Sequence, residues 1–333
     1  MESEIKALFK MENYTYQASG VNLENSNLLN RLLVSKLKSE NFNNFAGVYK
    51  LHNLGNYCLT ATTDGIGTKI IPLIEKKMFK TMAIDLAAMN LNDIICTGAT
   101  PLFFLDYLAL NKLEPELISN FIEELNIVLS QYNCSLLGGE TSELGDFIKN
   151  DMFDAAGFLV GLVKEEDLLK KENVKENDII IGLKSSGAHS NGFSLIRKLK
   201  KDNLLTEEEF AKSLAPTTIY TKEILNICDK KLASSLANIT GGGILSNIER
   251  IIPEGLCAVL DKNSIPKLEI FNIIRKFVSE DEMYQTFNMG AGFCIIADEK
   301  NADKILEIVK NHKPFIFGRV EKSKNGTKAR FKA

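Results

Sequence analysis

Hydrophobic positions in the first half of the chain alternate between two spacings. Leu28, Leu29, Leu32, Leu33 and Leu37 recur every three or four residues, which predicts an amphipathic helix. Short apolar runs predict strands at 58–63, 102–108, 134–137 and 158–163, and longer periodic stretches predict helices at 81–97 and 115–132. This order of elements is typical of a mixed α/β domain.

The second half repeats the alternation. Strands are expected at 178–184, 233–239, 292–297 and 315–320, and helices at 193–201, 206–214, 217–230, 268–278 and 302–311. Between the halves, residues 164–177 are charged and carry no β-branched run, as expected of a connection. We therefore expect two mixed α/β domains, 1–166 and 167–333, with Gly-rich loops at strand ends that suit small ligands.

Composition narrows the class of protein. With 333 residues the chain exceeds one typical core, and 45% hydrophobic with 25% charged residues is the balance of a globular protein. The net charge of -3 leaves no basic excess, so no nucleic-acid partner is expected. No apolar run approaches the roughly 20 residues of a membrane span, and the first residues lack the order of a secretory signal. The six cysteines form no Cys-x-x-Cys pair, so we expect reduced thiols in a cytoplasmic protein.

The segment 64–69, Asp-Gly-Ile-Gly-Thr-Lys, follows the first predicted strand. Gly65 and Gly67 allow backbone N–H groups to approach an oxyanion closely. Thr68 adds a hydroxyl, Lys69 a cation and Asp64 a hard oxygen ligand for Mg²⁺. The spacing is not that of a Walker A loop. The segment is compatible with a phosphate-binding turn and also with a hairpin turn that carries one solvated lysine.

Polar residues also interrupt the apolar helix expected at 81–97. Asp85, Met89 and Asn92 share one stripe of that helix, and Asp93 borders it. Burying two carboxylates and an amide is costly without a partner, and the apolar neighbours leave little room for a solvated face. A divalent metal or a bound polar ligand is therefore favoured over a solvated face.

The segment 138–141, Gly-Gly-Glu-Thr, ends the strand expected at 134–137. Glu140 is compatible with a metal ligand or general base and equally with an ordinary strand-end turn. Together, however, Asp64, Asp93 and Glu140 place carboxylates at several element ends of one domain. That pattern is expected of a nucleotide–Mg²⁺ site built from several loops.

Two Gly-rich loops carry the candidate chemistry of the second half. Residues 185–192 (Ser-Ser-Gly-Ala-His-Ser-Asn-Gly) open a predicted helix, whose N–H groups and dipole suit a phosphate or carboxylate. Ser190 or Asn191 is expected to cap that helix. His189 has the chemistry of a proton acceptor or a substrate contact, and it is equally compatible with holding the loop. Residues 240–243, Thr-Gly-Gly-Gly, present a similar loop before another helix.

These motifs resemble those of the phosphoribosylformylglycinamidine cyclo-ligase (AIR synthetase) family of purine biosynthesis. The resemblance rests on segments 16–21, 64–69, 92–93, 101–107, 138–141, 185–192, 215–217, 240–243 and 286–290, which occur in order along nearly the whole chain. The turn at 64–69 is shared with related ATP-using enzymes. The segments at 189–192, 240–243 and 286–290 point more narrowly to the cyclo-ligase.

The resemblance implies two α/β domains, the first of which pairs in a homodimer so that two four-stranded sheets form a barrel. It also implies an ATP-dependent ring closure: ATP phosphorylates the formamide oxygen of formylglycinamidine ribonucleotide, the amidine nitrogen attacks that carbon, and phosphate leaves. The products are aminoimidazole ribonucleotide, ADP and phosphate. Residues 1–166 would bind ATP and Mg²⁺ and form the dimer, and residues 167–333 would face the ribonucleotide.

The resemblance also assigns expected roles to residues of this sequence. The residues expected in the chemistry are His189, Asp64 and Lys69, and those expected at the metal are Asp64, Asp93 and Glu140. ATP is expected at Gly65, Gly67, Thr68, Lys69, Asn92, Asp93, Gly139 and Glu140. The ribonucleotide is expected at Ser186, Gly187, His189, Ser190, Asn191, Thr240, Gly241 and Gly242.

Two other functions stay open. A sister ATP-using enzyme, such as a thiamine-phosphate kinase or selenophosphate synthetase, shares the turn, although no cysteine precedes Cys58 as the latter usually requires. A non-catalytic nucleotide-binding subunit is the other alternative. The chain also departs from the cyclo-ligase pattern at Asn22, at 42–47, at 144–145 and at Thr218. The resemblance therefore says least about the N-terminal segment and about the detailed contacts to the substrate.

Overall fold

The computed structural model describes residues 14–19, 28, 45–51, 55–148 and 152–332. Within these residues the first half forms a sheet in the order β1-β2-β5-β3-β4. Its strands are β1 (Gly47–Lys50), β2 (Tyr57–Gly65), β3 (Thr100–Leu110), β4 (Ser135–Glu143) and β5 (Phe153–Lys164). Neighbouring strands are antiparallel except β3 and β4, which are parallel and are joined through a helix.

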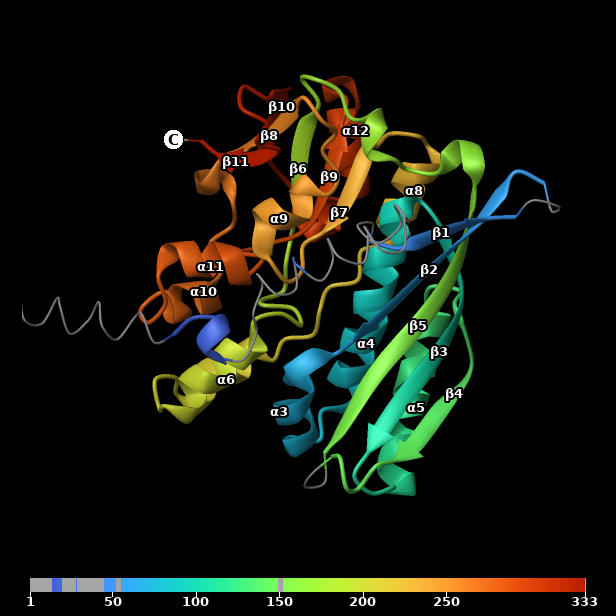
Figure 1. Cartoon of the computed structure of the whole chain (residues 1–333), viewed down its shortest axis with the longest axis vertical. Helices are drawn as coiled ribbons and strands as arrows, with labels where there is room; N and C mark the ends of the chain where they lie inside the picture. The colour runs from blue at the N-terminus through green and yellow to red at the C-terminus, as the bar shows by residue number, and fades with distance from the viewer. Residues whose placement is uncertain (1–13, 20–27, 29–44, 52–54, 149–151, 333) are drawn as a thin grey trace, which may run out of the picture.

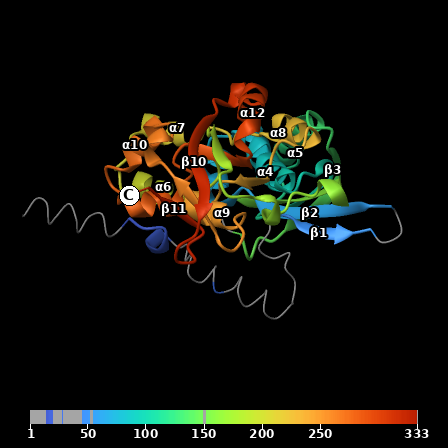
Figure 2. The same cartoon turned by 90° about the horizontal axis from the view of Figure 1, so that it is seen from above.

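Helices cover one face of this sheet. They are α3 (Ile70–Glu75), α4 (Phe79–Ile94) and α5 (Pro115–Ser130), with the short 3₁₀ turns η3 (Gly67–Lys69) and η4 (Ile95–Thr97) at the ends of α3 and α4. Helix α4 contacts β2 and β5 on one side and the second half of the chain on the other. It is therefore buried almost all round, which explains why its sequence is apolar on nearly every side. In both views, α4 and α5 lie on the same side of the first sheet (Figures 1 and 2).

The second half forms a sheet in the order β11-β8-β10-β6-β9-β7. Its strands are β6 (Ile179–Lys184), β7 (Ser235–Asn238), β8 (Leu256–Leu260), β9 (Ala291–Ala297), β10 (Phe315–Lys322) and β11 (Ala329–Phe331). Its helices are α6 (Phe193–Lys201), α7 (Glu207–Ser213), α8 (Thr221–Asp229), α9 (Gly243–Glu249), α10 (Glu269–Ile274), α11 (Glu280–Thr286) and α12 (Ala302–Ile308). Short 3₁₀ turns lie at η1 (Gln17–Ser19), η5 (Glu165–Asp167), η6 (Lys171–Asn173), η7 (Lys262–Ser264), η8 (Glu299–Asn301) and η9 (Lys310–His312). The predicted mixed α/β class is confirmed.

Several predicted bounds differ from the structure. Strand β4 runs straight through the diglycine at 138–139, so Glu140 lies within a strand and not in a strand-end turn. Helix α8 begins at Thr221, because residues 215–220 form a loop against the first half. Strands β1, β8 and β11 and helices α3 and α11 were not predicted. The predicted leucine helix from Leu29 onward, Asn22 and residues 42–44 lie outside the described residues.

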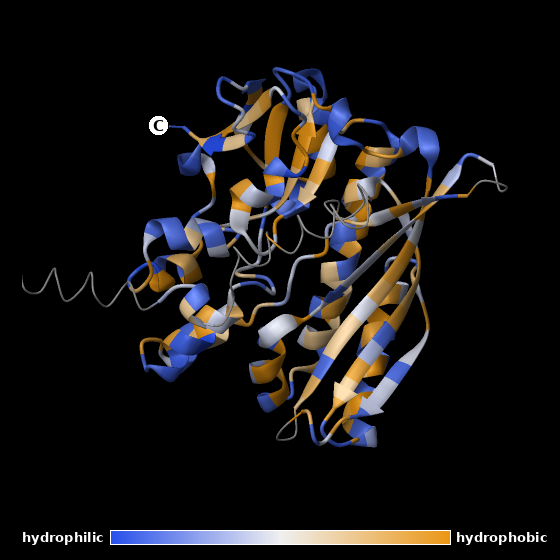
Figure 3. Ribbon diagram, in the orientation of Figure 1, coloured by the Kyte–Doolittle hydropathy of each residue, from blue (hydrophilic) through white to orange (hydrophobic). Residues whose placement is uncertain are grey.

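The face of the first sheet opposite α4 and α5 carries exposed apolar side chains. Tyr49 is 66% exposed and Leu137 is 63% exposed. Leu102, Leu105, Tyr107 and Phe158 are also exposed there. Figure 3 shows apolar residues along the strands of this sheet. Among the described residues, no helix has both the length and the apolar character needed to cross a bilayer.

Candidate active site

A cavity of about 270 Å³ lies between the two halves of the chain. One wall is the end of β2 and the turn after it, from Asp64 to Thr68, and the other is the stretch from Ser190 to Ser194. Tyr16, Met89 and Thr240 complete the lining. Two segments that the sequence marks as anion-binding loops therefore meet across one cavity.

Asp64 is held at the end of β2 by helix α4. Its backbone N–H donates to Asn90 Oδ1 (3.1 Å), and Asn90 Nδ2 donates to the Asp64 carbonyl (3.2 Å). The N–H of Gly65 donates to the Asp64 carboxylate (2.8 Å). Gly67 has a φ of +70°, a conformation that favours glycine and lets the chain turn into η3. The sequence singled out Asp64 but not Asn90, which orients it.

Asp93 and Asp64 form a pair of half-buried carboxylates whose like charges repel each other. Burial raises the pKa of Asp64 to about 6, although the Gly65 N–H lowers it slightly. Burial and the charge of Asp64 raise the pKa of Asp93 to about 7, while the hydrogen bond from Asn238 Nδ2 (2.8 Å) and the charge of Arg250 act in the other direction. Two carboxylates with shared, raised pKa values are typical of a site that is completed by a cation.

These two carboxylates fit a Mg²⁺ ion that is also bound by phosphate. Mg²⁺ in nucleotide sites uses one or two carboxylates, and its other ligands are substrate phosphates and waters. No cluster of three or more acidic, cysteine or histidine side chains suited to a metal occurs among the described residues. The donor set available within one chain is therefore the pair Asp64 and Asp93.

Glu140 does not join that pair within one chain. It lies on β4 opposite Tyr107 of β3, and Tyr107 belongs to the exposed face of the sheet. Strands β3 and β5 separate β4 from β2, so the two sites are about 14 Å apart at strand spacing. Gly139 faces the other way, and a Cβ at this position would overlap Asp106, so a glycine is required there.

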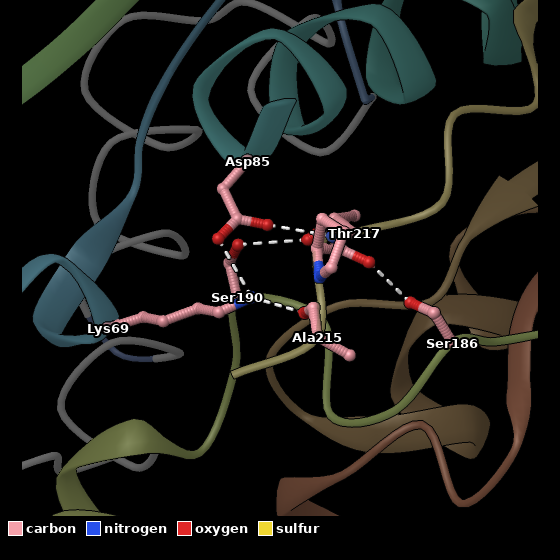
Figure 4. A network of polar contacts seen from close by, with 7 residues as sticks. Lys69, Asp85, Ser186, Ser190, Ala215 and Thr217 are labelled. Atoms are coloured by element: carbon pink, nitrogen blue, oxygen red, sulfur yellow. Dashed lines mark hydrogen bonds and ion pairs between the residues drawn. The ribbon is translucent and has the colours of Figure 1, made fainter. Parts of the chain in front are cut away.

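Lys69 lies in a fully buried ion pair with Asp85. Its Nζ is 2.8 Å from Asp85 Oδ2 and donates to the carbonyl of Ala215 (2.7 Å), and both side chains are 0% exposed (Figure 4). Asp85 in turn accepts the N–H of Thr217 (2.8 Å). Burial lowers the pKa of Lys69 and raises that of Asp85, and their mutual attraction opposes both shifts. The expected phosphate-binding lysine is thus engaged in holding the loop at 215–217.

The polar stripe of α4 has partners that the protein itself supplies. Besides the Lys69–Asp85 pair, Asn92 Nδ2 donates to the carbonyl of Thr218 (2.9 Å), and Asn92 Oδ1 accepts the N–H of Tyr220 (3.1 Å). Asn92 is buried and does not line the cavity. The interpretation of this stripe as a ligand site is therefore wrong for Asp85, and the structure gives Asn92 no position facing a nucleotide.

Two serines of the loop at 185–192 dock onto the same segment. Ser186 Oγ donates to the carbonyl of Pro216 (2.6 Å), and Ser190 Oγ lies 3.1 Å from Thr217 Oγ1 (Figure 4). Neither Ser190 nor Asn191 caps α6, contrary to expectation, because Gly192 occupies the N-cap in a left-handed conformation. Asn191 lines the cavity, and its Nδ2 is buried without a hydrogen-bond partner among the described residues.

His189 is buried beneath the loop and does not line the cavity. Its Nε2 accepts the N–H of Ser186 (3.3 Å), so the neutral ring carries its proton on Nδ1. Burial, with a contribution from the charge of Lys69, lowers the pKa of His189 to about 3. The expectation of a proton acceptor with an ordinary pKa near neutrality is therefore not met, and the geometry favours the alternative in which His189 holds the loop.

The segment at 286–290 positions this loop from behind. Asn288 Oδ1 accepts the hydroxyl of Ser185 (2.9 Å), and Asn288 Nδ2 donates to the carbonyl of Gly187 (2.9 Å). Phe287 packs so closely on Gly192 that a Cβ at position 192 would overlap its ring. The sequence identifies 286–290 as a motif. Its role in supporting the loop could not be predicted, because the contacts join residues about a hundred positions apart.

The turn at 240–243 is held by one asparagine. Asn247 Nδ2 donates to the carbonyls of Thr240, Gly241 and Gly243. Gly242 and Gly243 have positive φ values, and a Cβ on Gly243 would overlap the Tyr284 carbonyl. Of the three expected substrate contacts in this turn, Thr240 lines the cavity.

Both halves of the chain match known protein families. The chain matches AIR synthase related protein, N-terminal domain, over residues 44–163 and AIR synthase related protein, C-terminal domain, over residues 175–329. It is 39% identical to the phosphoribosylformylglycinamidine cyclo-ligase of Clostridium kluyveri, over 92% of this chain and 97% of that protein.

Solved structures share the fold at lower identity. The HypE-HypF complex aligns at 17% identity and a TM-score of 0.68 over 91% of this chain and 95% of that chain. AaThiL complexed with AMPPCP and TMP aligns at 17% identity and a TM-score of 0.66 over 91% of this chain and 92% of that chain. The relative in Clostridium kluyveri is close enough to show the family, and this chain belongs to the phosphoribosylformylglycinamidine cyclo-ligase family.

Proposed function

We propose that this chain catalyses the ATP-dependent ring closure of formylglycinamidine ribonucleotide to aminoimidazole ribonucleotide, with release of ADP and phosphate. The observation that carries the proposal is the cavity in which the turn from Asp64 to Thr68 meets the loop from Ser190 to Ser194. One wall offers the carboxylate of Asp64, whose charge also acts on Asp93, for a metal-bound triphosphate, and the other offers hydroxyl and amide groups for a second substrate. The 39% identity to a named cyclo-ligase supports the choice of reaction.

In this proposal the protein contributes mainly positioning and charge neutralisation. The formamide oxygen attacks the γ-phosphorus of ATP, and ADP leaves; the amidine nitrogen then attacks the activated carbon, and phosphate leaves with the former formamide oxygen. Gly65, Gly67 and Thr68 would face the triphosphate, and Ser190, Asn191 and Thr240 would face the ribonucleotide. Orienting both substrates in one cavity lowers the entropic cost of each step.

We propose that Asp64 and Asp93 hold a Mg²⁺ ion together with the triphosphate. When bound, the ion neutralises charge on the transferring phosphoryl group. The structural neighbour AaThiL is described as a complex with AMPPCP, an ATP analogue, which supports nucleotide binding by this fold. Glu140 takes part in this scheme only from a partner subunit, because within one chain it lies on the far face of the sheet.

We further propose that residues 1–166 form the ATP-binding and dimerisation domain and residues 167–333 the substrate-side domain. The exposed apolar face of the first sheet supports the dimer, because an apolar sheet face of this size needs a cover. Leu105→Glu should convert a dimer into a monomer in sedimentation experiments, whereas Lys304→Glu, on the outer surface of α12, should not. A wild-type monomer at micromolar concentration would contradict the proposed dimer.

The reaction is tested by ADP release with three substrates: formylglycinamidine ribonucleotide, thiamine phosphate and selenide. We expect turnover only with the ribonucleotide, and a product with the mass of aminoimidazole ribonucleotide. Turnover of thiamine phosphate or selenide would favour the sister enzymes. ATP binding without turnover of any of the three would favour a non-catalytic subunit.

A further inference from the structure

A second and larger cavity, of about 790 Å³, adjoins the candidate active site. Ser194 lines both cavities, and its Oγ lies 3.3 Å from Thr68 Oγ1 on the opposite wall. The larger cavity is bounded by η1, α3, α6 and the first turn of α7. The two cavities therefore lie next to each other at the start of α6, and the contact between Ser194 and Thr68 marks their boundary.

The charged residues of the large cavity are mostly basic, although the whole chain has a net charge of -3. Its basic lining residues are Lys76, Arg197, Lys198, Lys200 and Lys201, and its acidic ones are Glu75, Asp202 and Glu207. The excess of positive charge is therefore local to this cavity.

Several of these charges are already engaged. Lys200 pairs with Glu207 (2.6 Å), Lys198 lies over the ring of Tyr14, and Asp202 accepts the Tyr14 hydroxyl (2.9 Å). Arg197 and Lys201, by contrast, have no acidic partner among the described residues. Two cations therefore face the cavity with their charge uncompensated.

Ser194, Arg197 and Lys201 form one stripe of α6, since they are spaced by three and four residues. The stripe runs about 10 Å along the helix, starting at the boundary with the small cavity. A ribose and its phosphate can bridge such a span. Arginine and lysine on one helix face are well suited to a phosphate monoester, because the guanidinium donates two parallel hydrogen bonds.

We propose that this stripe binds the 5′-phosphate of the ribonucleotide substrate. The inference rests on the proposed function for the identity of the substrate, and it adds the subsite that holds the substrate's phosphate. The reacting formamide and amidine then lie in the small cavity, beside the triphosphate at Asp64. The two phosphate groups are thus recognised at separate places, one by carboxylates through a metal and the other by basic side chains directly.

Steady-state kinetics test the subsite. Arg197→Ala and Lys201→Ala should each raise the KM for the ribonucleotide about ten- to a hundredfold, with little change in kcat or in the KM for ATP. Lys304→Ala removes an exposed lysine of α12 outside the cavity and serves as the matched control. A raised KM for ATP, or an unchanged KM for both substrates, would overturn the proposal.

Direct binding separates this proposal from the reaction. By calorimetry, ribose 5-phosphate should bind to the wild type and to Lys304→Ala but not to Arg197→Ala, and ribose should bind to none of them. This measurement does not require turnover, so it holds even if the ring-closure assay fails. Equal binding of ribose 5-phosphate to the wild type and Arg197→Ala would overturn the subsite, and unchanged melting temperatures confirm that the variants are folded.

Discussion

Two clusters of charged side chains each include one carboxylate of helix α4, and they differ in one respect. Lys69 and Asp85 compensate each other, and the backbone at 215–217 satisfies their remaining hydrogen-bonding groups. Asp64, at the end of β2, and Asp93, on α4, are both acidic, and the charge of Asp64 raises the pKa of Asp93. Charge that is compensated inside the protein serves the structure, whereas two like charges that lie close together are the more direct sign of a ligand site.

The two clusters also have different roles. The paired cluster attaches the segment at 215–217, and through Ser186 and Ser190 it attaches the loop of the second half. Asp64, of the second cluster, lines the cavity where that loop meets the phosphate turn. The first therefore positions the site that the second completes.

The largest expected effect comes from breaking the unpaired cluster. Asp93→Asn removes one metal ligand while its amide oxygen can still accept from Asn238, so activity should fall at least about a hundredfold and the fold should persist. ADP release and thermal unfolding measure the two effects. Asp303→Asn, an exposed position on α12, is the matched control. Near-normal activity in Asp93→Asn would remove Asp93 from the site.

Breaking the paired cluster should have the opposite profile. Lys69→Met leaves the Asp85 carboxylate buried without its cation, which should lower the free energy of unfolding by about 3–5 kcal/mol. The double variant Lys69→Met/Asp85→Leu should recover most of that loss, because neither charge remains. Urea denaturation of the four members of this cycle gives the coupling energy. A single-variant loss below about 1 kcal/mol would show that the pair does not hold the halves together.

Changing the pH sharpens the comparison without a mutation. The pKa values of Asp64 (about 6) and Asp93 (about 7) exceed the ordinary 3.8, so the folded protein binds more protons than the unfolded chain between about pH 4 and pH 7. The stabilisation present at low pH is therefore lost as the pH rises through this window. Urea denaturation at several pH values should show a smaller loss in Asp93→Asn than in the wild type. Equal pH dependence in both proteins would contradict the assignment.

The smallest expected effect concerns His189, whose pKa depends in part on the charge of Lys69. With a pKa of about 3 its ring should stay neutral between about pH 5 and pH 8 in an NMR titration. In Lys69→Met this pKa should rise, because the lysine charge helps to lower it. His189→Ala should raise the KM for the ribonucleotide a few-fold and leave the pH profile of kcat unchanged. Loss of the acidic limb of that profile would restore His189 as a proton acceptor.

The elements of the fold were predictable where local pattern is strong. Helix α6 coincides with its predicted bounds at 193–201, and strands β6 and β9 differ from prediction by one residue at one end. Strand β4 was truncated in the prediction, because the diglycine at 138–139 resembles a turn. In the structure, Gly139 is instead needed for the close approach of Asp106.

The sequence predicted which segments form the candidate site, but it did not predict which side chains of these segments contact one another. The turn at 64–68, the loop at 190–192 and Thr240 were all singled out, and they line one cavity. Asn90 and Asn238, which orient these segments, were missed, and Asn288 lay in the motif at 286–290 without an assigned role. A buried asparagine has no distinctive local pattern, and its role depends on what faces it.

The sequence by itself determined which residue types are available and which of them share a helix face or a strand, since both follow from local backbone geometry. It thereby established the mixed α/β class, the anion-binding loops and the resemblance to the cyclo-ligase family. Only the tertiary structure decided that Lys69 is committed to Asp85, that Asp64 and Asp93 are left facing each other, and that Glu140 lies on the opposite face of the sheet. The physical reason is that charge compensation depends on distances between segments far apart in the chain, which strand register and helix packing set together.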